Sequence, residues 1–317
     1  MKKFTSANDA LDINYLIDRA VYYKSNPFAD SALGQNKRMG LLFLNPSLRT
    51  RISTQIAARN LGIEVIILNI DKDGWNLELN EGAIMNGTKV EHIRDAAPVL
   101  GAYFDIIGVR TFPGLSNKEE DYNELLLSQL MHHSGIPIVS LESSTLHPLQ
   151  SLADLVTIWE NHNKITRPKI VLTWAPHIKP IPHCVANSFA QWINKWDNAD
   201  FVITHPEGYE LSEQFTDGAN IMHHQKEALA GADFVYVKNW SSYNDYGKVC
   251  CEDSSWMLTE QHLIDAPDAK VMHCLPVRRN IELSDEILDG KRSLVTQQGA
   301  NRVWATQAVL AEILKMS

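Results

Sequence analysis

Residues 39–51 read MGLLFLNPSLRTR, an apolar run that passes directly into a polar segment. A near-continuous apolar run of this length is typical of a strand buried on both faces of a parallel sheet. After it, Ile52, Ile56 and Ala57 recur at the spacing of one helical face. The stretch therefore predicts a strand that leads straight into a helix.

The same alternation continues along the chain and predicts an α/β fold with right-handed crossovers. Buried strands are expected at 39–44, 63–70, 104–110, 137–141, 169–174, 200–204, 233–238 and 270–274. Amphipathic helical stretches are expected at 88–101, 119–133, 148–162, 185–197 and 299–316.

A break in this pattern divides the chain into two domains, which matches its 317 residues. The segment 142–148, ESSTLHP, holds small residues and ends in a proline suited to a first helical turn. We expect domains at 1–147 and 148–298, each a parallel sheet flanked by helices. A last segment, 299–317, is expected to pack as a helix back on the first domain.

Composition excludes several classes of protein. The 38 acidic and 29 basic residues give a formal net charge of -9, which disfavours nucleic acid and anionic membranes as partners. No apolar run is long enough to span a membrane, and the N-terminal MKKFTSANDALDINYL lacks the apolar core of a signal peptide. We therefore expect a cytoplasmic protein of ordinary globular composition.

No cofactor or metal is expected. The four cysteines, Cys184, Cys250, Cys251 and Cys274, form no C-x-x-C pair and are best read as reduced thiols. The adjacent pairs His132-His133 and His223-His224 are expected to be structural or solvated.

The segment after the first strand is a candidate anion site. Ser47 is a plausible N-cap, and a helix N-terminus attracts negative charge through its free N–H groups and its dipole. Arg49 adds a fork that fits phosphate oxygens, and Thr50 adds a hydroxyl. The alternative is an ordinary N-cap followed by two solvated arginines.

Four segments in one order resemble the aspartate/ornithine carbamoyltransferase family. Ser-Leu-Arg-Thr-Arg at 47–51 is similar to its S-x-R-T-R signature, and Gly-Val-Arg at 108–110 ends a later strand. His-Pro-Leu-Gln at 147–150 and His-Cys-Leu-Pro at 273–276 match two further family motifs. The resemblance spans essentially the whole chain and implies transfer of a carbamoyl group from carbamoyl phosphate to an amine.

The resemblance also implies how the donor is held. The phosphate would be bound by Ser47, Leu48, Arg49 and Thr50. The carbonyl oxygen would meet Arg110 and His147, and Gln150 would fix the carbamoyl amide. A late family arginine corresponds to Arg302.

Backbone carbonyls of Cys274 and Leu275 would accept from the carbamoyl NH2, at a turn where the family has a cis peptide, here Leu275-Pro276. The residues implied to be catalytic are Arg110, His147, Cys274 and Arg302.

Each of these residues has a plainer reading. Arg110 could pair with an acid such as Asp105, and His147 could be a capping or packing residue. Cys274 could be a small buried hydrophobe. Asp154, one turn into its helix, could orient His147 or Arg278, or act only on the helix dipole.

The acceptor side departs from ordinary ornithine enzymes. Their D-x-x-x-S-M-G motif is replaced by Val237-Lys238-Asn239-Trp240-Ser241-Ser242, and a lysine there would repel an α-ammonium group. The segment 173–183, TWAPHIKPIPH, resembles the proline-rich loop of acylornithine carbamoyltransferases. The alternative for this segment is a rigid surface loop.

The acyl-amino-acid contacts of those relatives correspond to Glu142, His177, Lys238 and Arg278. We therefore expect an acceptor whose α-nitrogen is acylated; the alternative is that an additional acid is present in the site.

Two further positions concern assembly and acyl selection. Trp75 matches a family residue that a neighbouring subunit contributes, which implies a homotrimer; the alternative is an exposed or locally packed tryptophan.

The acetyl-selective relatives resemble G-x-x-E-E-H where this chain reads Gly-Thr-Lys-Val-Glu-His at 87–92. Val90 would leave room for a succinyl group, so N-succinyl-L-ornithine is the expected acceptor. The alternative is that Val90 packs with Ile93 in the helix expected at 88–101.

Other readings remain open from the sequence. N-Acetylornithine, ornithine or putrescine could be the acceptor, and a non-catalytic anion-binding homologue is the chief rival from another class. A nucleotide-binding α/β protein is disfavoured because no G-x-G-x-x-G or Walker A loop follows a strand.

Overall fold

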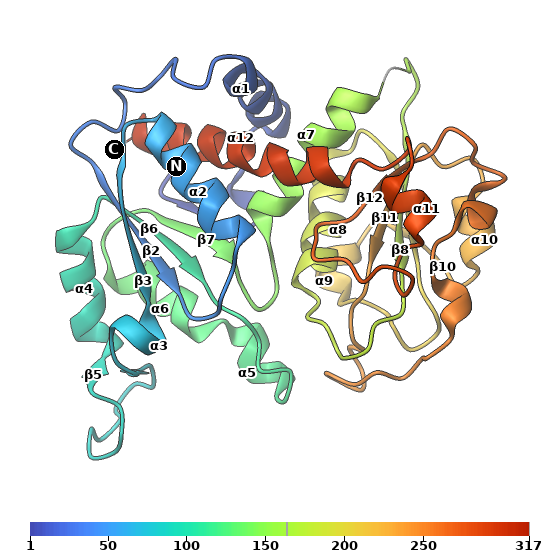
Figure 1. Ribbon diagram of the computed structural model, residues 1–317. Coiled ribbons are helices and arrows are strands. Elements are labelled where there is room, and N and C mark those ends of the chain that lie inside the picture. Colours follow the sequence, from blue (N-terminus) through green and yellow to red (C-terminus); the bar gives the residue numbers. More distant parts are fainter. Residues whose placement is uncertain (163, 317) are drawn as a thin grey trace. The chain divides into compact units, whose positions relative to one another are not determined.

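A computed structural model describes residues 1–162 and 164–316 of the chain. The chain forms two compact units. The first combines residues 1–114, 119–149 and the C-terminal residues from 302 onward; the second combines 115–118 and 150–301. Each unit contains one five-stranded parallel sheet, so the α/β class with two parallel sheets is confirmed (Figure 1).

The first sheet has the strand order β1-β7-β6-β2-β3. Its strands are β1 (Lys3–Phe4), β2 (Arg38–Phe43), β3 (Glu64–Asn69), β6 (Ile106–Arg110) and β7 (Ile138–Glu142). All neighbours pair in parallel, and the four longer strands confirm the sequence prediction. Strand β1 was not predicted, because two residues carry no periodicity.

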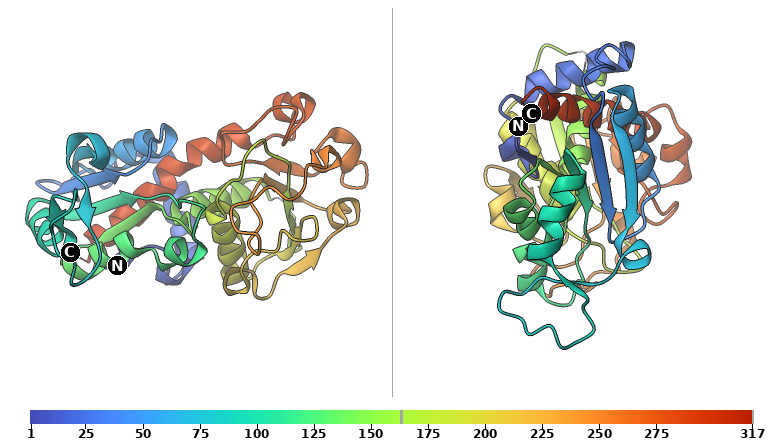
Figure 2. Two further views of the ribbon diagram at one scale, coloured as in Figure 1. Left: turned by 90° about the horizontal axis from the view of Figure 1, so that it is seen from below. Right: turned by 90° about the vertical axis from the view of Figure 1, so that its left-hand side faces the viewer.

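Helices cover both faces of this sheet, as near-continuous apolar strands require (Figures 1 and 2). One face packs on α4 (Ile93–Tyr103) and α6 (Leu125–His133), through side chains such as Ile93 and Leu130. The other face lies under α1 (Ile13–Ser25), α2 (Arg49–Asn60) and the end of α12 (Val295–Leu314).

The return of the last helix to the first unit is confirmed. Asn60 of α2 donates to the Gln307 side chain at 2.9 Å, both groups being buried. Met1 contacts Met316, so the two ends of the chain meet in this unit (Figure 2).

Several predicted helices begin or end elsewhere, and the one expected at 299–316 is α12, which runs from Val295 to Leu314. The helix expected at 88–101 starts at Ile93, because the His92 side chain caps it by accepting from the Arg94 N–H at 3.1 Å. Residues Glu91–His92 instead form β5, which pairs with β4 (Leu77–Glu78).

The helix expected at 119–133 divides into α5 (Lys118–Asn123) and α6 at Glu124, whose φ is 44°. The Glu124 carboxylate accepts from the Thr145 N–H at 2.7 Å, and this bond holds the break.

The second sheet has the order β10-β9-β8-β11-β12, again parallel throughout. Its strands are β8 (Lys169–Trp174), β9 (Asp200–Thr204), β10 (Asn220–Met222), β11 (Phe234–Lys238) and β12 (Lys270–Met272). The three-residue β10 was not predicted. On one face, Phe189 of α8 (Cys184–Trp196) packs its ring 4.4 Å from that of Tyr236. Short helices α10 (Gln225–Leu229) and α11 (Asp285–Asp289) cover the other.

Helix α7 (Pro148–Asn161) begins in the first unit and continues into the second, as α12 does in the reverse direction. Among the described residues, none of the helices combines the length and apolar character that a membrane crossing requires.

The contact between α4 and α6 predicts a stability difference between two helical glycines. A Cβ on Gly101 would lie 1.9 Å from the Ser134 carbonyl oxygen, whereas one on Gly299 in α12 would meet nothing within 4 Å. Gly101→Ala should lower the free energy of unfolding by about 1–3 kcal/mol. Gly299→Ala should be neutral or stabilising by up to about 1 kcal/mol. Urea denaturation measures both, and equal stability of the two variants would contradict this packing.

Candidate functional site

The start of α2 differs from the sequence prediction in its cap. Ser47 was expected to be the N-cap, but Leu48 is, with φ -81° and ψ -60°, and no side chain bonds to the first amides. The Leu48 carbonyl already accepts from the Ile52 N–H at 3.2 Å, so the first turn begins after Ser47 and leaves it outside the helix. The free N–H groups of this helix end thus lack a capping acceptor, which suits an anion.

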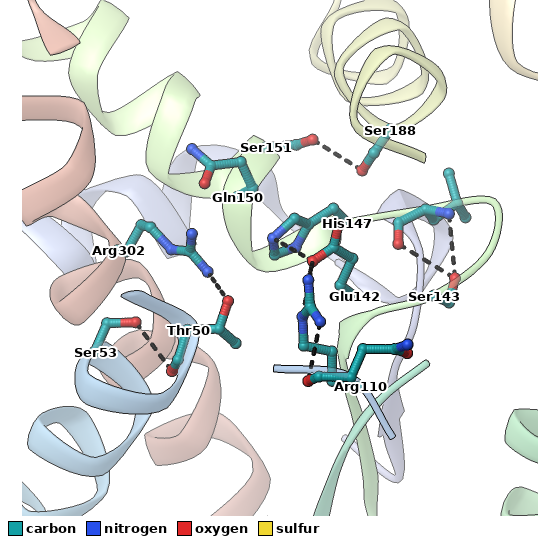
Figure 3. A network of polar contacts seen from close by, with 12 residues as sticks. Thr50, Ser53, Arg110, Glu142, Ser143, His147, Gln150, Ser151, Ser188 and Arg302 are labelled. Atoms are coloured by element: carbon teal, nitrogen blue, oxygen red, sulfur yellow. Dashed lines mark hydrogen bonds and ion pairs between the residues drawn. The ribbon is translucent and has the colours of Figure 1, made fainter. Parts of the chain in front are cut away.

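Arg49 occupies the first position of α2 and is half-buried. In the part of the chain that the structure describes, its guanidinium has no hydrogen bond or ion pair. Thr50 beside it is buried, and its hydroxyl accepts from Arg302 Nη2 at 2.6 Å. Because Arg302 lies in α12, the last helix places a second guanidinium at the start of α2 (Figure 3).

Arg110 ends β6 at the carboxyl edge of the first sheet, where ligands bind in open α/β sheets. Its Nε and Nη2 donate to Glu142 Oε2 at 3.0 and 2.8 Å, and its Nη1 donates to the carbonyls of Asn45 and Pro46 at 3.1 Å each. The suggested pairing with Asp105 is wrong, because that carboxylate pairs with Lys37 at 3.1 Å. Arg110 therefore ties the loop before α2 to the end of β7 (Figure 3).

His147 lies next to this ion pair, with Nε2 at 3.8 Å from Glu142 Oε2. Burial lowers the pKa of His147 to about 3; the Glu142 carboxylate raises it, and the charges of Arg302 and Arg110 lower it. Burial opposes ionisation of Glu142, but His147, Arg110 and Arg302 together hold its pKa below the usual range. The imidazole is therefore neutral beside an ionised carboxylate. Its buried Nδ1 has no hydrogen-bond partner among the described residues.

Gln150 is held in the second unit by a carboxylate. Its Nε2 donates to Asp154 Oδ1 at 2.8 Å, and Gln298 Nε2 donates to the same oxygen at 2.7 Å. Those bonds direct the Asp154 carboxylate toward two amides. The buried Oε1 of Gln150 has no partner among the described residues, so it is free to accept from an amide NH2.

The residues of the second unit that are predicted to bind the acylornithine lie near the ends of β8, β11 and β12. Lys238 is the last residue of β11, pairs in register with Trp174 and is buried. Arg278 Nε donates to His177 Nε2 at 3.1 Å. That bond leaves the His177 proton on Nδ1, which lies 2.9 Å from the Lys179 carbonyl. Burial, with Lys238 and Arg278 nearby, lowers the pKa of His177, so this group orients Arg278 as a neutral imidazole.

The turn after β12 has the expected cis Leu275-Pro276 peptide. The Leu275 N–H donates to His273 Nδ1 at 3.0 Å, and the His273 N–H donates to Gln298 Oε1 at 2.9 Å. Cys274 is buried at this turn, with 8% of its surface exposed. These bonds fix the backbone at Cys274 and Leu275, whose carbonyls are the candidate hydrogen-bond acceptors for a carbamoyl NH2.

Glu282 is a residue of the candidate site that the sequence did not predict. It is 1% exposed, binds His273 Nε2 at 3.3 Å through Oε1 and accepts from the Arg278 N–H at 2.8 Å through Oε2. Burial opposes its ionisation, but His273 and Lys238 lower its pKa to about 2. It thus supports the cis-peptide turn and Arg278 together. No pattern in the sequence marks a glutamate in a loop for this role.

Trp75 and Val90 lie close together, and Glu142 lies beside Arg110. Trp75 donates from Nε1 to Glu91 at 2.8 Å, and the Val90 N–H donates to the Asn76 carbonyl at 3.1 Å, so the small β4-β5 pair joins Trp75 and Val90. Glu142, which was predicted among the acylornithine contacts, pairs with Arg110 at 2.8 Å.

Comparisons with known proteins identify the family of this chain. Residues 2–160 match the family model described as aspartate/ornithine carbamoyltransferase, carbamoyl-P binding domain, and residues 183–313 match the corresponding Asp/Orn binding domain. N-Succinylornithine carbamoyltransferase of Bacteroides fragilis is 46% identical over 317 residues, covering 99% of both chains. N-Acetylornithine carbamoyltransferase of Xanthomonas campestris is 30% identical, covering 100% of this chain and 99% of that one.

One solved structure is similar to this protein over nearly the whole chain. It is a glutamate-to-valine mutant of N-acetyl-L-ornithine transcarbamylase, complexed with carbamyl phosphate and N-succinyl-L-norvaline. The TM-score is 0.91 at 30% identity, with 99% of this chain and 100% of that chain covered. The chain therefore belongs to the aspartate/ornithine carbamoyltransferase family.

Proposed function

We propose that this enzyme transfers the carbamoyl group of carbamoyl phosphate to the δ-amine of N-succinyl-L-ornithine. The products are N-succinyl-L-citrulline and phosphate, and the reaction belongs to arginine biosynthesis. The observation that carries the donor assignment is the uncapped start of α2, where Arg49 has no partner among the described residues. The 46% identity to an N-succinylornithine enzyme supports the acceptor.

The donor contacts follow from the charges of the first unit. Amides and side chains of residues 47–50 bind the phosphate, and Arg302 approaches it beside Thr50. Arg110 and the neutral His147 donate to the carbonyl oxygen, on which negative charge develops. Gln150 accepts from the carbamoyl NH2 through its free Oε1, as do the carbonyls of Cys274 and Leu275.

The chemistry needs no covalent enzyme intermediate. The unprotonated δ-amine attacks the carbonyl carbon, a C–N bond forms, and the C–O bond to phosphate breaks. Phosphate leaves with the electron pair of that bond, and the proton that the amine loses ends on the phosphate. The buried Cys274 thiol lies at the turn that receives the carbamoyl group. Alignment of two bound reactants of this kind can contribute about 7–11 kcal/mol.

The basic side chains of the second unit select an acylated, dianionic acceptor. Lys238 and Arg278 carry positive charge, and His177 orients Arg278 through the 3.1 Å bond. A free α-ammonium would be repelled by Lys238, whereas carboxylates of the amino acid and the succinyl group are attracted. N-Acetyl-L-ornithine remains the alternative acceptor, given the 30% identity to enzymes named for it.

We further propose a cytoplasmic homotrimer in which one subunit completes the site of its neighbour. Trp75 is 53% exposed and Val90 is 65% exposed, and they lie just before the paired strands β4 and β5 respectively. If Trp75 reaches a neighbouring donor site, Val90 reaches the same site. Ile52 and Ile56 of α2 are also exposed, at 49% and 41%, which suits a surface that other subunits cover.

Loss of the Arg49 guanidinium should remove detectable turnover. Arg49→Ala should lower kcat/KM for carbamoyl phosphate by at least about 10²-fold, because a charge-assisted contact to the phosphate is lost. Thermal unfolding should be unchanged, since this side chain has no partner among described residues. Arg59→Ala, an exposed arginine near the other end of α2, serves as the matched control. Near-normal turnover of Arg49→Ala would refute the anion site.

Shared sites predict complementation between inactive variants. Co-expressed Trp75→Ala and Arg49→Ala chains with different tags should form hybrids that regain activity, because a hybrid can hold one site with both residues. A mixture of Arg49→Ala with the Arg49→Ala, Trp75→Ala double variant should stay inactive. A fully active monomer in sedimentation, or purified hybrids without activity, would contradict shared sites.

Acyl selection should depend on Val90. The suggested packing of Val90 in a helix with Ile93 is wrong, since Val90 precedes β5 and is exposed while Ile93 is buried. Val90→Glu should move the kcat/KM ratio from N-succinyl- toward N-acetyl-L-ornithine, because a carboxylate repels the succinyl carboxylate. Val99→Glu, at another exposed valine, is the control and should leave the ratio unchanged. An unchanged ratio in Val90→Glu would refute the assignment of this position.

A further inference from the structure

Two histidines stand side by side at the edge of the second sheet, outside the residues already assigned. Strands β9 and β10 pair in parallel with Thr204 opposite Met222, and His205 and His223 each follow directly. The His205 N–H donates to the Met222 carbonyl at 3.2 Å, which continues the ladder by one step. The two imidazole rings lie 5.0 Å apart at 79°. The strand pairing therefore brings together two residues that are far apart in sequence.

A carboxylate joins the two rings. Glu210 lies on the loop after β9, where the Tyr209 N–H donates to the Pro206 carbonyl and closes a turn. One ring nitrogen of each histidine and one carboxylate oxygen of Glu210 all lie within 4.8 Å of one another. Two imidazoles and one carboxylate form a donor set that binds divalent transition metals.

Backbone hydrogen bonds set the tautomers that metal binding needs. Nδ1 of His205 lies 2.8 Å from the Pro206 carbonyl, and Nδ1 of His223 lies 3.1 Å from the His205 carbonyl. Carbonyl oxygens only accept, so each Nδ1 carries the proton and each Nε2 carries the lone pair. Metal-binding histidines are usually held by such a bond from the other ring nitrogen.

The three groups are otherwise unused. Among the described residues, neither Nε2 has a hydrogen bond, and Glu210 accepts only from the Gly208 N–H at 3.1 Å. Burial also lowers the pKa of His205, which keeps its lone pair available. His205 is 1% exposed and packs on Trp240, whereas His223 is exposed and Glu210 half-buried. The His205 side chain is thus held in place, whereas those of His223 and Glu210 have room to move.

We propose that His205, Glu210 and His223 form a binding site for a divalent transition metal, with Zn²⁺ as the best fit. Zn²⁺ binds nitrogen and oxygen at about 2.0–2.2 Å, so binding draws His223 and Glu210 slightly inward toward His205. Water completes the coordination. The ion joins the β9 loop to the three-residue edge strand β10 and so stabilises this side of the second sheet.

The test is Zn²⁺ titration of protein stripped with EDTA, by calorimetry, together with Co²⁺ absorption spectra. The native protein should bind one Zn²⁺ per chain at this site, and Zn²⁺ should raise its Tm. His223→Ala should weaken binding by about tenfold or more and abolish the Tm shift, since a ligand is lost. His224→Ala, the exposed neighbour that is not part of the cluster, should bind like the native protein.

Two outcomes would overturn the proposal. One is the absence of saturable binding to the native protein. The other is equal binding by His223→Ala and His224→Ala, which would place the ion elsewhere, for instance on the free thiols Cys250 and Cys251. Circular dichroism of each variant checks that the fold is retained.

Discussion

The ion pair between Arg110 and Glu142 is the interaction on which the candidate site of the first unit depends. Both side chains are nearly buried, and a buried charge costs several kcal/mol unless it is paired and hydrogen-bonded. Arg110 satisfies that requirement with Glu142 and two loop carbonyls, and so holds the segment that leads into α2. His147 beside the pair stays neutral chiefly because burial lowers its pKa, although the Glu142 carboxylate raises it.

The second unit repeats this arrangement with different residues. Glu282 is a buried carboxylate that supports His273, the cis-peptide turn and the Arg278 backbone. In each unit, a buried acid holds part of an arginine at the candidate site, the Arg110 side chain in the first and the Arg278 backbone in the second. Local basic residues of this kind can balance bound anions, although the whole chain has a formal net charge of -9.

The sequence predicted the long strands well, because buried parallel strands are apolar runs that few other structures produce. The ends of helices were predicted less well where a single side chain determines the local backbone conformation. Leu48 rather than Ser47 begins the turn of α2, and the His92 side chain starts α4 five residues later than periodicity suggested. The motif residues of the site could be named from the family resemblance. Glu282 could not, because only the fold brings its carboxylate to the Arg278 N–H.

The closeness of His205 and His223 depends likewise on β10, a strand too short to be seen in sequence. The choice of carbamoyl acceptor, in turn, depends on the basic residues of the second unit. The most direct measurement is the rate of ureido product formed from carbamoyl phosphate with N-succinyl-L-ornithine, N-acetyl-L-ornithine, L-ornithine or putrescine in turn. The charges around Lys238 and Arg278 predict the highest kcat/KM for N-succinyl-L-ornithine and no appreciable product from L-ornithine. A preference for L-ornithine, or no product with any amine, would contradict the account.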